Sequence, residues 1–335
     1  MTRRLRLQDC YLYAIASPKD LARRLSTHHC QVTAGELEVL ARDAGNFNVF
    51  PSRKNGNVRM VQQPRPLLQR LHRRMHDLLS RVETPGYLHS AVAGRSYITN
   101  AATHRCDVPA IKIDVKKFFR SVPRGAVYRF FAGPMRCNTE VAGLLARLLT
   151  YASHLPTGSS ASPIIAYYAF KEMFDAIHEL ARSRGLTMTC YVDDMSLSGV
   201  KASRSALHEI RKLIAKNGLK SHKARFLPAH RPMIITGVAV TRKGMRVPNR
   251  RHRAIAEGFR EYRSAANIAD ANKVYIKLVS RMHEAGQIEG HWKARAKTLQ
   301  AEHRRRVQAD LPERAESEVR DAVSVQVEVA RPRAA

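Results

Sequence analysis

The sequence predicts an α+β fold in which helices pack on one face of an antiparallel sheet. Two segments, 46–66 and 188–198, alternate apolar and polar residues on either side of a short turn, as β-hairpins do. Most of the other segments carry apolar residues at helical spacing. With 335 residues, of which 44% are hydrophobic, the chain is long enough to build a sizeable core.

The first elements are helices followed by a hairpin. Residues 1–45 are expected to be helical, with a helix beginning after Ser17 because a serine followed by proline is a typical helix start. Residues 46–66 form two strands around the Asn55-Gly56 turn, which is typical of tight hairpins. The next segment, 67–82, reads as a basic amphipathic helix.

The remaining elements alternate between strands and helices. Strands are expected over 108–115, in the 188–198 hairpin and on both sides of Gly237. Ser162 and Pro163 are suited to the N-cap and first position of a helix. Further helices are predicted over 138–153, 162–185, 203–218 and 250–310. The segment 311–335 is expected to be a loose tail, the alternative being a strand that pairs with a partner's sheet edge.

The charge of the chain predicts a polyanionic partner. Lys and Arg number 58 against 28 Asp and Glu, which gives a formal net charge of +30, and the basic residues are spread along the whole chain. Nucleic acid is the first candidate partner. No apolar run is long enough to cross a membrane, and the basic start without a sustained apolar stretch leads us to expect no secretory signal. The five cysteines are scattered without a CxxC pair, so we expect a cytoplasmic protein without a zinc site.

Three aspartates are the candidate catalytic residues. Asp193 and Asp194 lie side by side in the turn of "CYVDDMSLSG", residues 190–199. Asp114 lies in the strand "PAIKIDVKKFF", on the same face as Lys112. If the two elements are neighbours in one sheet, three carboxylates converge, and oxygen ligands of this kind select Mg²⁺. Two such ions would support phosphoryl transfer. The alternative is a solvated turn without catalytic function.

These motifs resemble those of reverse transcriptases. "YVDD" at 191–194 is similar to their YxDD signature, and "IKIDVKKFFRSV" to their first palm motif. "LPTGSSASP" at 155–163 resembles the motif that joins palm to fingers, and "NGNVRMVQQPRPLLQRLHRRM" a fingers segment. "NAATH" at 100–104 resembles the NAxxH motif of bacterial retron reverse transcriptases, and "ITG" at 235–237 their VTG motif.

The resemblance implies a right-hand polymerase with fingers, an antiparallel-sheet palm and a helical thumb. The fingers and N-terminal helical region would span 1–110, the palm with interleaved fingers elements 111–240, the basic thumb 241–311 and a tail 312–335. Trp292, the single tryptophan, is expected in the core of the thumb.

The resemblance also implies roles for single residues. The three aspartates would hold two Mg²⁺ ions, with the Val115 carbonyl completing one metal shell. Lys223 matches the lysine that protonates the leaving pyrophosphate, and Lys220 is its competitor. Nucleotide-binding residues would be Lys54, Arg59, Phe119, Thr157 and Gly158. Residues that recognise RNA would be Asn100, His104, Thr236 and Gly237.

Alternatives accompany several of these roles. Lys54 and Arg59 are otherwise solvated charges of a hairpin, and Phe119 is otherwise a core residue, while Phe118 is the better core candidate. Gly158 fits a close backbone approach to the nucleotide or template. Thr157 stands where the family often has Gln, so nucleotide contacts there would differ.

The resemblance implies a retron function. The partner would be a cognate structured noncoding RNA, which serves as template and supplies a 2′-hydroxyl primer, and dNTPs would be the substrates. The product would be a branched RNA–DNA hybrid that stays bound. A separate effector protein and defence against phage are further implications. Substituting Asn100 or His104 would then abolish use of the cognate RNA and spare a generic primer-template.

Two other functions remain open. One is another bacterial reverse transcriptase class, of the group II intron or abortive-infection type. The other is a non-catalytic RNA-binding scaffold that kept the fold and lost polymerisation.

Overall fold

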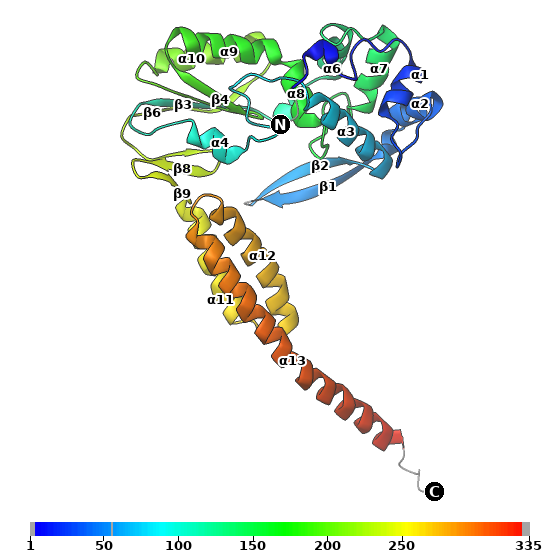
Figure 1. The fold of residues 1–335 in the computed structure, drawn as a ribbon, viewed down its shortest axis with the longest axis vertical. Helices are drawn as coiled ribbons and strands as arrows, with labels where there is room; N and C mark the ends of the chain where they lie inside the picture. Colours follow the sequence, from blue (N-terminus) through cyan, green and yellow to red (C-terminus); the bar gives the residue numbers. More distant parts are fainter. Residues whose placement is uncertain (1–3, 55, 330–335) are drawn as a thin grey trace. The chain divides into compact units, whose positions relative to one another are not determined.

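The computed structural model describes residues 4–54 and 56–329, apart from the side chains of residues 44, 54, 57 and 311–329. The chain forms two compact units. The first comprises Met1–Thr236 with Val240–Arg242, and the second Gly237–Ala239 with Lys243–Ala335 (Figure 1). The α+β prediction is confirmed. The division falls near residue 240, where the sequence predicts the start of the thumb, while the expected fingers and palm belong to one unit.

The N-terminal elements follow the prediction closely. A 3-10 turn, η1 (Leu7–Asp9), precedes helices α1 (Pro18–Leu25) and α2 (Ala34–Arg42). The Ser17 hydroxyl accepts a hydrogen bond from the Asp20 N–H, which confirms the predicted helix start. After η2 (Ala44–Asn46), strands β1 (Phe47–Lys54) and β2 (Asn57–Pro64) pair as an antiparallel hairpin. Helices α3 (Pro66–Leu79) and α4 (Tyr97–Ala102) follow.

A four-stranded antiparallel sheet carries the candidate site. Its strands are β3 (Ala110–Val115), β4 (Thr187–Tyr191), β5 (Asp194–Ser198) and β6 (Ser221–Leu227), in the order β4-β5-β3-β6. Ile111, Ile113 and Val115 are buried, whereas Lys112 and Asp114 are partly exposed on the opposite face, as the alternation predicts. Helices α9 (Lys171–Ser183) and α10 (Arg204–Lys216) pack on each other and against β4 and β6 (Figure 1).

The predicted single helix over 162–185 is wrong. The chain forms α8 (Ser162–Ala169) and then α9, because Phe170 leaves helical geometry with φ −124° and ψ 23°. Its ring then lies 6.2 Å from that of Phe118 in the core. The predicted Ser162 N-cap is also wrong, since Ala161 holds that position and the Ser162 hydroxyl donates to the Pro156 carbonyl at 2.6 Å. The remaining helices of this unit are α5 (Phe118–Ser121), α6 (Arg124–Ala132) and α7 (Thr139–Leu148).

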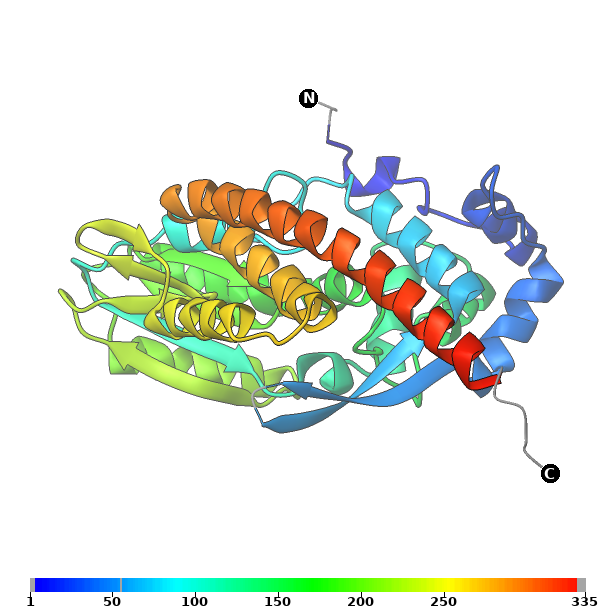
Figure 2. The same ribbon diagram turned by 90° about the horizontal axis from the view of Figure 1, so that it is seen from below.

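The second unit contains mainly helices. The short strands β7 (Met233–Ile235), β8 (Val238–Thr241) and β9 (Gly244–Arg246) form a sheet where the chain passes from the first unit to the second, so strands do flank Gly237 as predicted. Helices α11 (Asn249–Arg263), α12 (Ile268–Gly286) and α13 (His291–Val329) then lie side by side (Figures 1 and 2). Trp292 is buried in their core, as expected.

The C-terminal segment differs from the sequence prediction. The backbone of α13 continues to Val329, so neither a loose tail nor a strand is present over residues 312–329. The rest of the predicted tail, 330–335, lies outside the described residues. Among the helices that the structure describes, none combines the length and apolarity needed to cross a lipid bilayer.

Candidate active site

The three aspartates come from two neighbouring strands and the turn beside them. Strands β3 and β5 pair antiparallel, and Asp114 stands directly opposite Asp194 in their register. The N–H of Val115 donates to the carbonyl of Asp193 at 3.1 Å, which fixes the backbone of the turn against the end of β3. The convergence of the three carboxylates required these elements to be neighbours in one sheet, and the pairing shows that they are. The role of the Val115 carbonyl stays a prediction.

The charges at this site are only partly compensated. Burial, together with the negative charges of Asp114 and Asp194, raises the pKa of Asp193 to about 7, although the Lys223 ammonium opposes this rise. Burial also raises the pKa of Asp194, while the Lys112 ammonium opposes that change. Like charges directly opposite each other in a sheet are destabilising. Clustered carboxylates with raised pKa values mark a candidate functional site rather than a solvated turn.

Two lysines pair with the opposed aspartates. The Lys112 Nζ lies 3.6 Å from Asp194 Oδ2, and the Lys223 Nζ lies 3.7 Å from Asp114 Oδ2. The Lys112 Nζ also donates to the carbonyl of Ile234 at 2.8 Å. The sequence placed Lys112 on the same face as Asp114 but assigned it no role. The sequence could not show that Lys112 pairs with Asp194, because this contact depends on the pairing of β3 with β5.

The structure distinguishes the two candidate proton donors. The register between β3 and β6 shifts after Lys112, and Lys223 takes a positive φ of 48° at this bulge. Bulges of this kind re-aim side chains, and the Lys223 ammonium points to Asp114. Both lysines are exposed, but Lys220 forms no ion pair with these aspartates in the described structure, and its carbonyl accepts a hydrogen bond from the Lys116 N–H at 2.8 Å. The geometry favours Lys223.

The site fits a divalent cation in its donor chemistry. Three carboxylates offer hard oxygen ligands, which Mg²⁺ prefers. Within the described part of the chain, however, no three His, Cys, Asp or Glu side chains are gathered closely enough to hold an ion as they stand. In this arrangement the lysines supply the positive charge beside Asp114 and Asp194.

The candidate nucleotide-binding residues fall into two groups. Arg59 is exposed on β2, opposite Ser52 across the hairpin, and the side chain of Lys54 lies outside the described residues. Phe119 is partly buried, with its ring 6.1 Å from Phe118, which is itself buried in the core as expected. Arg59 and Phe119 therefore keep surface available to a ligand.

Thr157 and Gly158 contact the fingers hairpin. The Gly158 N–H donates to the Gln62 carbonyl at 2.9 Å, and a Cβ added at Gly158 would lie 2.7 Å from that oxygen. The Thr157 hydroxyl donates to Gln62 Oε1 at 3.0 Å. Gly158 does make a close backbone approach, to strand β2, and its predicted approach to a nucleotide or template stays a prediction. Buried Gln62 was missed, because its neighbour is 95 residues away in sequence.

The predicted RNA-recognition residues are mainly internal. His104 is buried and lies 2.7 Å from both Ser198 Oγ on β5 and Thr189 Oγ1 on β4. Asn100 is fully buried, and its amide donates to the Thr236 hydroxyl at 3.3 Å. Neither side chain reaches solvent, so any effect on RNA recognition would act through the residues that Asn100 and His104 contact, and their role in recognition stays a prediction.

The loop around Gly237 has a local structural role. The Thr236 hydroxyl donates to the Tyr97 carbonyl at 2.8 Å, which ties it to α4. Gly237 has a φ of 81°, a conformation that glycine adopts without strain. A Cβ there would lie 3.0 Å from the Arg251 guanidinium. These contacts give the Thr-Gly pair a structural role, and its role in RNA recognition stays a prediction.

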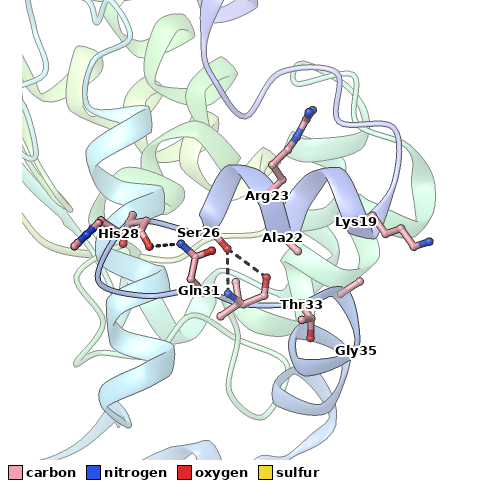
Figure 3. Close-up of a pocket in the computed structure, with 11 residues that line it drawn as sticks. Lys19, Ala22, Arg23, Ser26, His28, Gln31, Thr33 and Gly35 are labelled. Carbon is pink, nitrogen blue, oxygen red and sulfur yellow. Dashed lines mark hydrogen bonds between the residues drawn. The ribbon is translucent and has the colours of Figure 1, made fainter.

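A separate pocket lies in the N-terminal helical region (Figure 3). It has a volume of about 800 Å³, and its lining includes Ser26, which exchanges hydrogen bonds with the Val32 backbone. Its lining residues are Lys19, Ala22, Arg23, Ser26, Thr27, His28, Gln31, Val32, Thr33, Ala34 and Gly35. None of the candidate site residues lines this pocket, so it is not part of the aspartate site.

Comparison with known proteins identifies the family. Residues 51–239 match the model of the reverse transcriptase (RNA-dependent DNA polymerase) family. The Retron Se72 reverse transcriptase of Salmonella heidelberg is 29% identical over 44% of this chain and 39% of its own length. The Retron Mx162 and Mx65 reverse transcriptases of Myxococcus xanthus are 27% and 31% identical, over 58% and 49% of this chain. Those two matches cover 47% and 42% of the relatives' lengths.

A solved structure of the foamy viral protease-reverse transcriptase in complex with double-stranded DNA is also similar, with a TM-score of 0.41 and 15% identity. The match covers 72% of this chain and 36% of that one, and the likeness is too distant to bear on the fold. The chain spans less than half the length of the three retron relatives named above. The family model covers more than half of the chain, including all three aspartates. The chain belongs to the reverse transcriptase family, and the curated relatives named above are retron reverse transcriptases.

Proposed function

We propose that this chain is an RNA-directed DNA polymerase of the retron type. The observation that carries the proposal is the pairing of β3 with β5, which sets Asp114 opposite Asp194 and beside Asp193. This arrangement lies within the segment that matches the reverse transcriptase family. In a sheet with a purely structural role, three carboxylates at the ends of two neighbouring strands would be unfavourable, because their mutual repulsion destabilises the sheet.

The chain's own residues would share the work as follows. Asp114, Asp193 and Asp194 would hold two Mg²⁺ ions, which stabilise the attacking and leaving oxygens of phosphoryl transfer. Lys112 and Lys223 pair with Asp194 and Asp114 in this structure, and bound Mg²⁺ would replace their ammonium groups beside these carboxylates. Lys223 is then free to donate a proton to the leaving pyrophosphate.

Substrate selection would depend on residues near these carboxylates. The partly exposed face of Phe119 would lie beneath the sugar of the incoming nucleotide and exclude a 2′-hydroxyl, which selects dNTPs. Exposed Arg59 would contact the triphosphate through charge-assisted hydrogen bonds. Lys54 would take a similar role.

The similarity to retron reverse transcriptases supports the choice of template. We infer that a cognate structured noncoding RNA serves as template and supplies a 2′-hydroxyl primer, which gives a branched RNA–DNA product. The net charge of +30 supports tight binding of this polyanion. A separate effector protein and a role in defence against phage complete the proposal.

A gel of the nucleic acid that co-purifies with the protein, expressed with its flanking DNA, tests this function. We expect a discrete DNA species whose mobility shifts on ribonuclease treatment, as an RNA-linked product requires. It should be absent from the Asp193→Asn, Asp194→Asn double variant and present in the exposed control Asp77→Asn. RNA alone, identical in wild type and double variant, would show that the chain is a binding scaffold.

A further inference from the structure

The turn that carries Asp193 and Asp194 contains an unfavourable backbone conformation. Val192, directly before Asp193, has a φ of 61°. The left-handed region is disfavoured for L-residues, and most strongly for β-branched side chains such as valine. Residues held in this way persist only where their surroundings determine the conformation. The contacts of Val192 should therefore show what holds the turn.

Ser90 provides such a contact. The N–H of Val192 donates to the Ser90 hydroxyl oxygen at 2.9 Å. Ser90 is only 4% exposed, so water cannot readily replace this acceptor. The two residues are 102 positions apart, and none of the sequence motifs assigned Ser90 a role.

The segment that carries Ser90 is itself fixed along the edge of β4. The Cys190 N–H donates to the Tyr87 carbonyl at 2.7 Å, and the His89 N–H donates to the Cys190 carbonyl at 2.8 Å. Leu88 and Cys190 thereby form a parallel bridge. Residues 87–89 therefore pair with β4 at Cys190, and Ser90 continues this pairing to Val192, at the start of the turn.

The side chains of Arg95 and Thr99 also form hydrogen bonds with this segment. The Arg95 guanidinium donates to the carbonyls of Pro85 and Leu88, both at 2.6 Å. The His89 ring lies 2.9 Å from the Thr99 hydroxyl at the start of α4. The Ser90 hydroxyl therefore has a fixed position relative to β4.

We propose that Ser90 is a positioning residue for DNA synthesis, an inference that rests on the proposed polymerase function. Its hydroxyl holds Val192 in the left-handed conformation and thereby aims the Asp193 and Asp194 side chains at the reacting phosphate. Ser90 acts through the Val192 backbone and makes no contact with substrate.

Hydrogen exchange tests the contact itself, independently of activity. The exchange of the Val192 amide is measured by mass spectrometry on the peptide 187–198 in wild type, Ser90→Ala and Ser90→Thr. We expect about tenfold faster exchange in Ser90→Ala and protection close to wild type in Ser90→Thr, which retains the hydroxyl. Equal protection in all three proteins would overturn the proposal.

Kinetics then tests the effect on the reaction. Ser90→Ala should lower kcat on a generic RNA template with a DNA primer about tenfold, with KM for the primer-template unchanged. Ser90→Thr should restore kcat, and Ser183→Ala, an exposed serine on α9, should leave it unchanged. In a Val192→Gly background, Ser90→Ala should lower kcat by less than about threefold, because glycine adopts a positive φ without a supporting hydrogen bond.

The outcomes separate this inference from the proposed function. The role of Ser90 is overturned if Ser90→Ala leaves kcat unchanged, or if it lowers kcat by the same factor in the Val192→Gly background. The polymerase function is not affected by either result. Absence of DNA synthesis by wild type, despite a protected Val192 amide, overturns the function. In that case Ser90 is a structural residue of the turn and the positioning role is also wrong.

Discussion

Asp114 and Asp194 stand opposite each other on β3 and β5, and each has a lysine ammonium within 4 Å, Lys223 for Asp114 and Lys112 for Asp194. Asp193 lies beside them with its pKa raised to about 7 by burial and by its acidic neighbours. The sheet therefore carries a concentration of like charge that lowers its stability. That loss is expected at an active site, where function and stability compete.

Removing the Asp193 charge should stabilise the protein and stop the reaction. The raised pKa means that the folded state binds more protons than the unfolded state between pH 4 and 7, so wild type loses stability as pH rises through this range. At pH 8, Asp193→Asn should raise the free energy of unfolding by about 1–2 kcal/mol, less than the full pKa change implies because solvent screens the partly exposed group.

Chemical denaturation at pH 5 and pH 8, combined with primer extension, measures both effects. The gain in stability should be smaller at pH 5, where Asp193 in wild type is largely protonated. Asp77→Asn, at an exposed aspartate, serves as the control. An Asp193→Asn protein that is less stable at pH 8, or that still extends primers at the wild-type rate, would contradict the assignment.

Lys223 and Lys220 should differ sharply in catalysis. Lys223→Ala should lower the rate of single-nucleotide incorporation about a hundredfold, the size of effect expected for loss of a general acid. Lys220→Ala should change it little, because the ion pair with Asp114 is made by Lys223 and not by Lys220. Rapid-quench measurement with saturating dNTP compares the two variants, and a larger loss in Lys220→Ala would reverse the choice.

His104 should make stability depend on pH below neutrality. Burial lowers its pKa to about 4, with smaller contributions from His89 and Lys112, so the folded state holds it neutral. The unfolded state takes up its proton first, and stability should fall by about 3 kcal/mol as pH drops from 6.5 to 4. His104→Gln should show less of this fall, and exposed His28→Gln should behave as wild type.

The same histidine decides between two explanations of the NAATH segment. His104 contacts both β4 and β5, the strands that flank the Asp193-Asp194 turn. His104→Gln should therefore reduce DNA synthesis on the cognate RNA and on a generic primer-template by similar factors. If His104→Gln reduced DNA synthesis only on the cognate RNA, His104 would serve RNA recognition, and the explanation from its buried contacts would be wrong.

Gly158 should be intolerant of a side chain. An alanine Cβ would lie 2.7 Å from the Gln62 carbonyl oxygen and 3.0 Å from the Gln63 Cα, and both are backbone atoms that cannot turn away. Gly158→Ala should separate the 155–163 loop from the hairpin, with a loss of about 1–3 kcal/mol in stability. It should also raise KM for dNTP. Thermal unfolding and steady-state kinetics measure these effects, and unchanged values would show that the loop adapts freely.

Much of the fold and the aspartate site could be read from local patterns. The alternation around Asn55-Gly56 located the fingers hairpin, and the alternation in 110–115 placed Lys112 and Asp114 on one face. The Ser17 helix start followed from the preference of serine for the N-cap. The break at Phe170 did not follow, because it depends on where the ring finds space beside Phe118.

The sequence by itself determined the family, the strand faces and the identity of the three aspartates, since each depends on residues close together in the chain. Only the tertiary structure decided which residues those aspartates meet. The pairing of Lys112 with Asp194, the burial of His104 between two strands and the support of Val192 by Ser90 join residues about 80 to 100 positions apart. Such contacts arise from strand order and register, which no local pattern specifies.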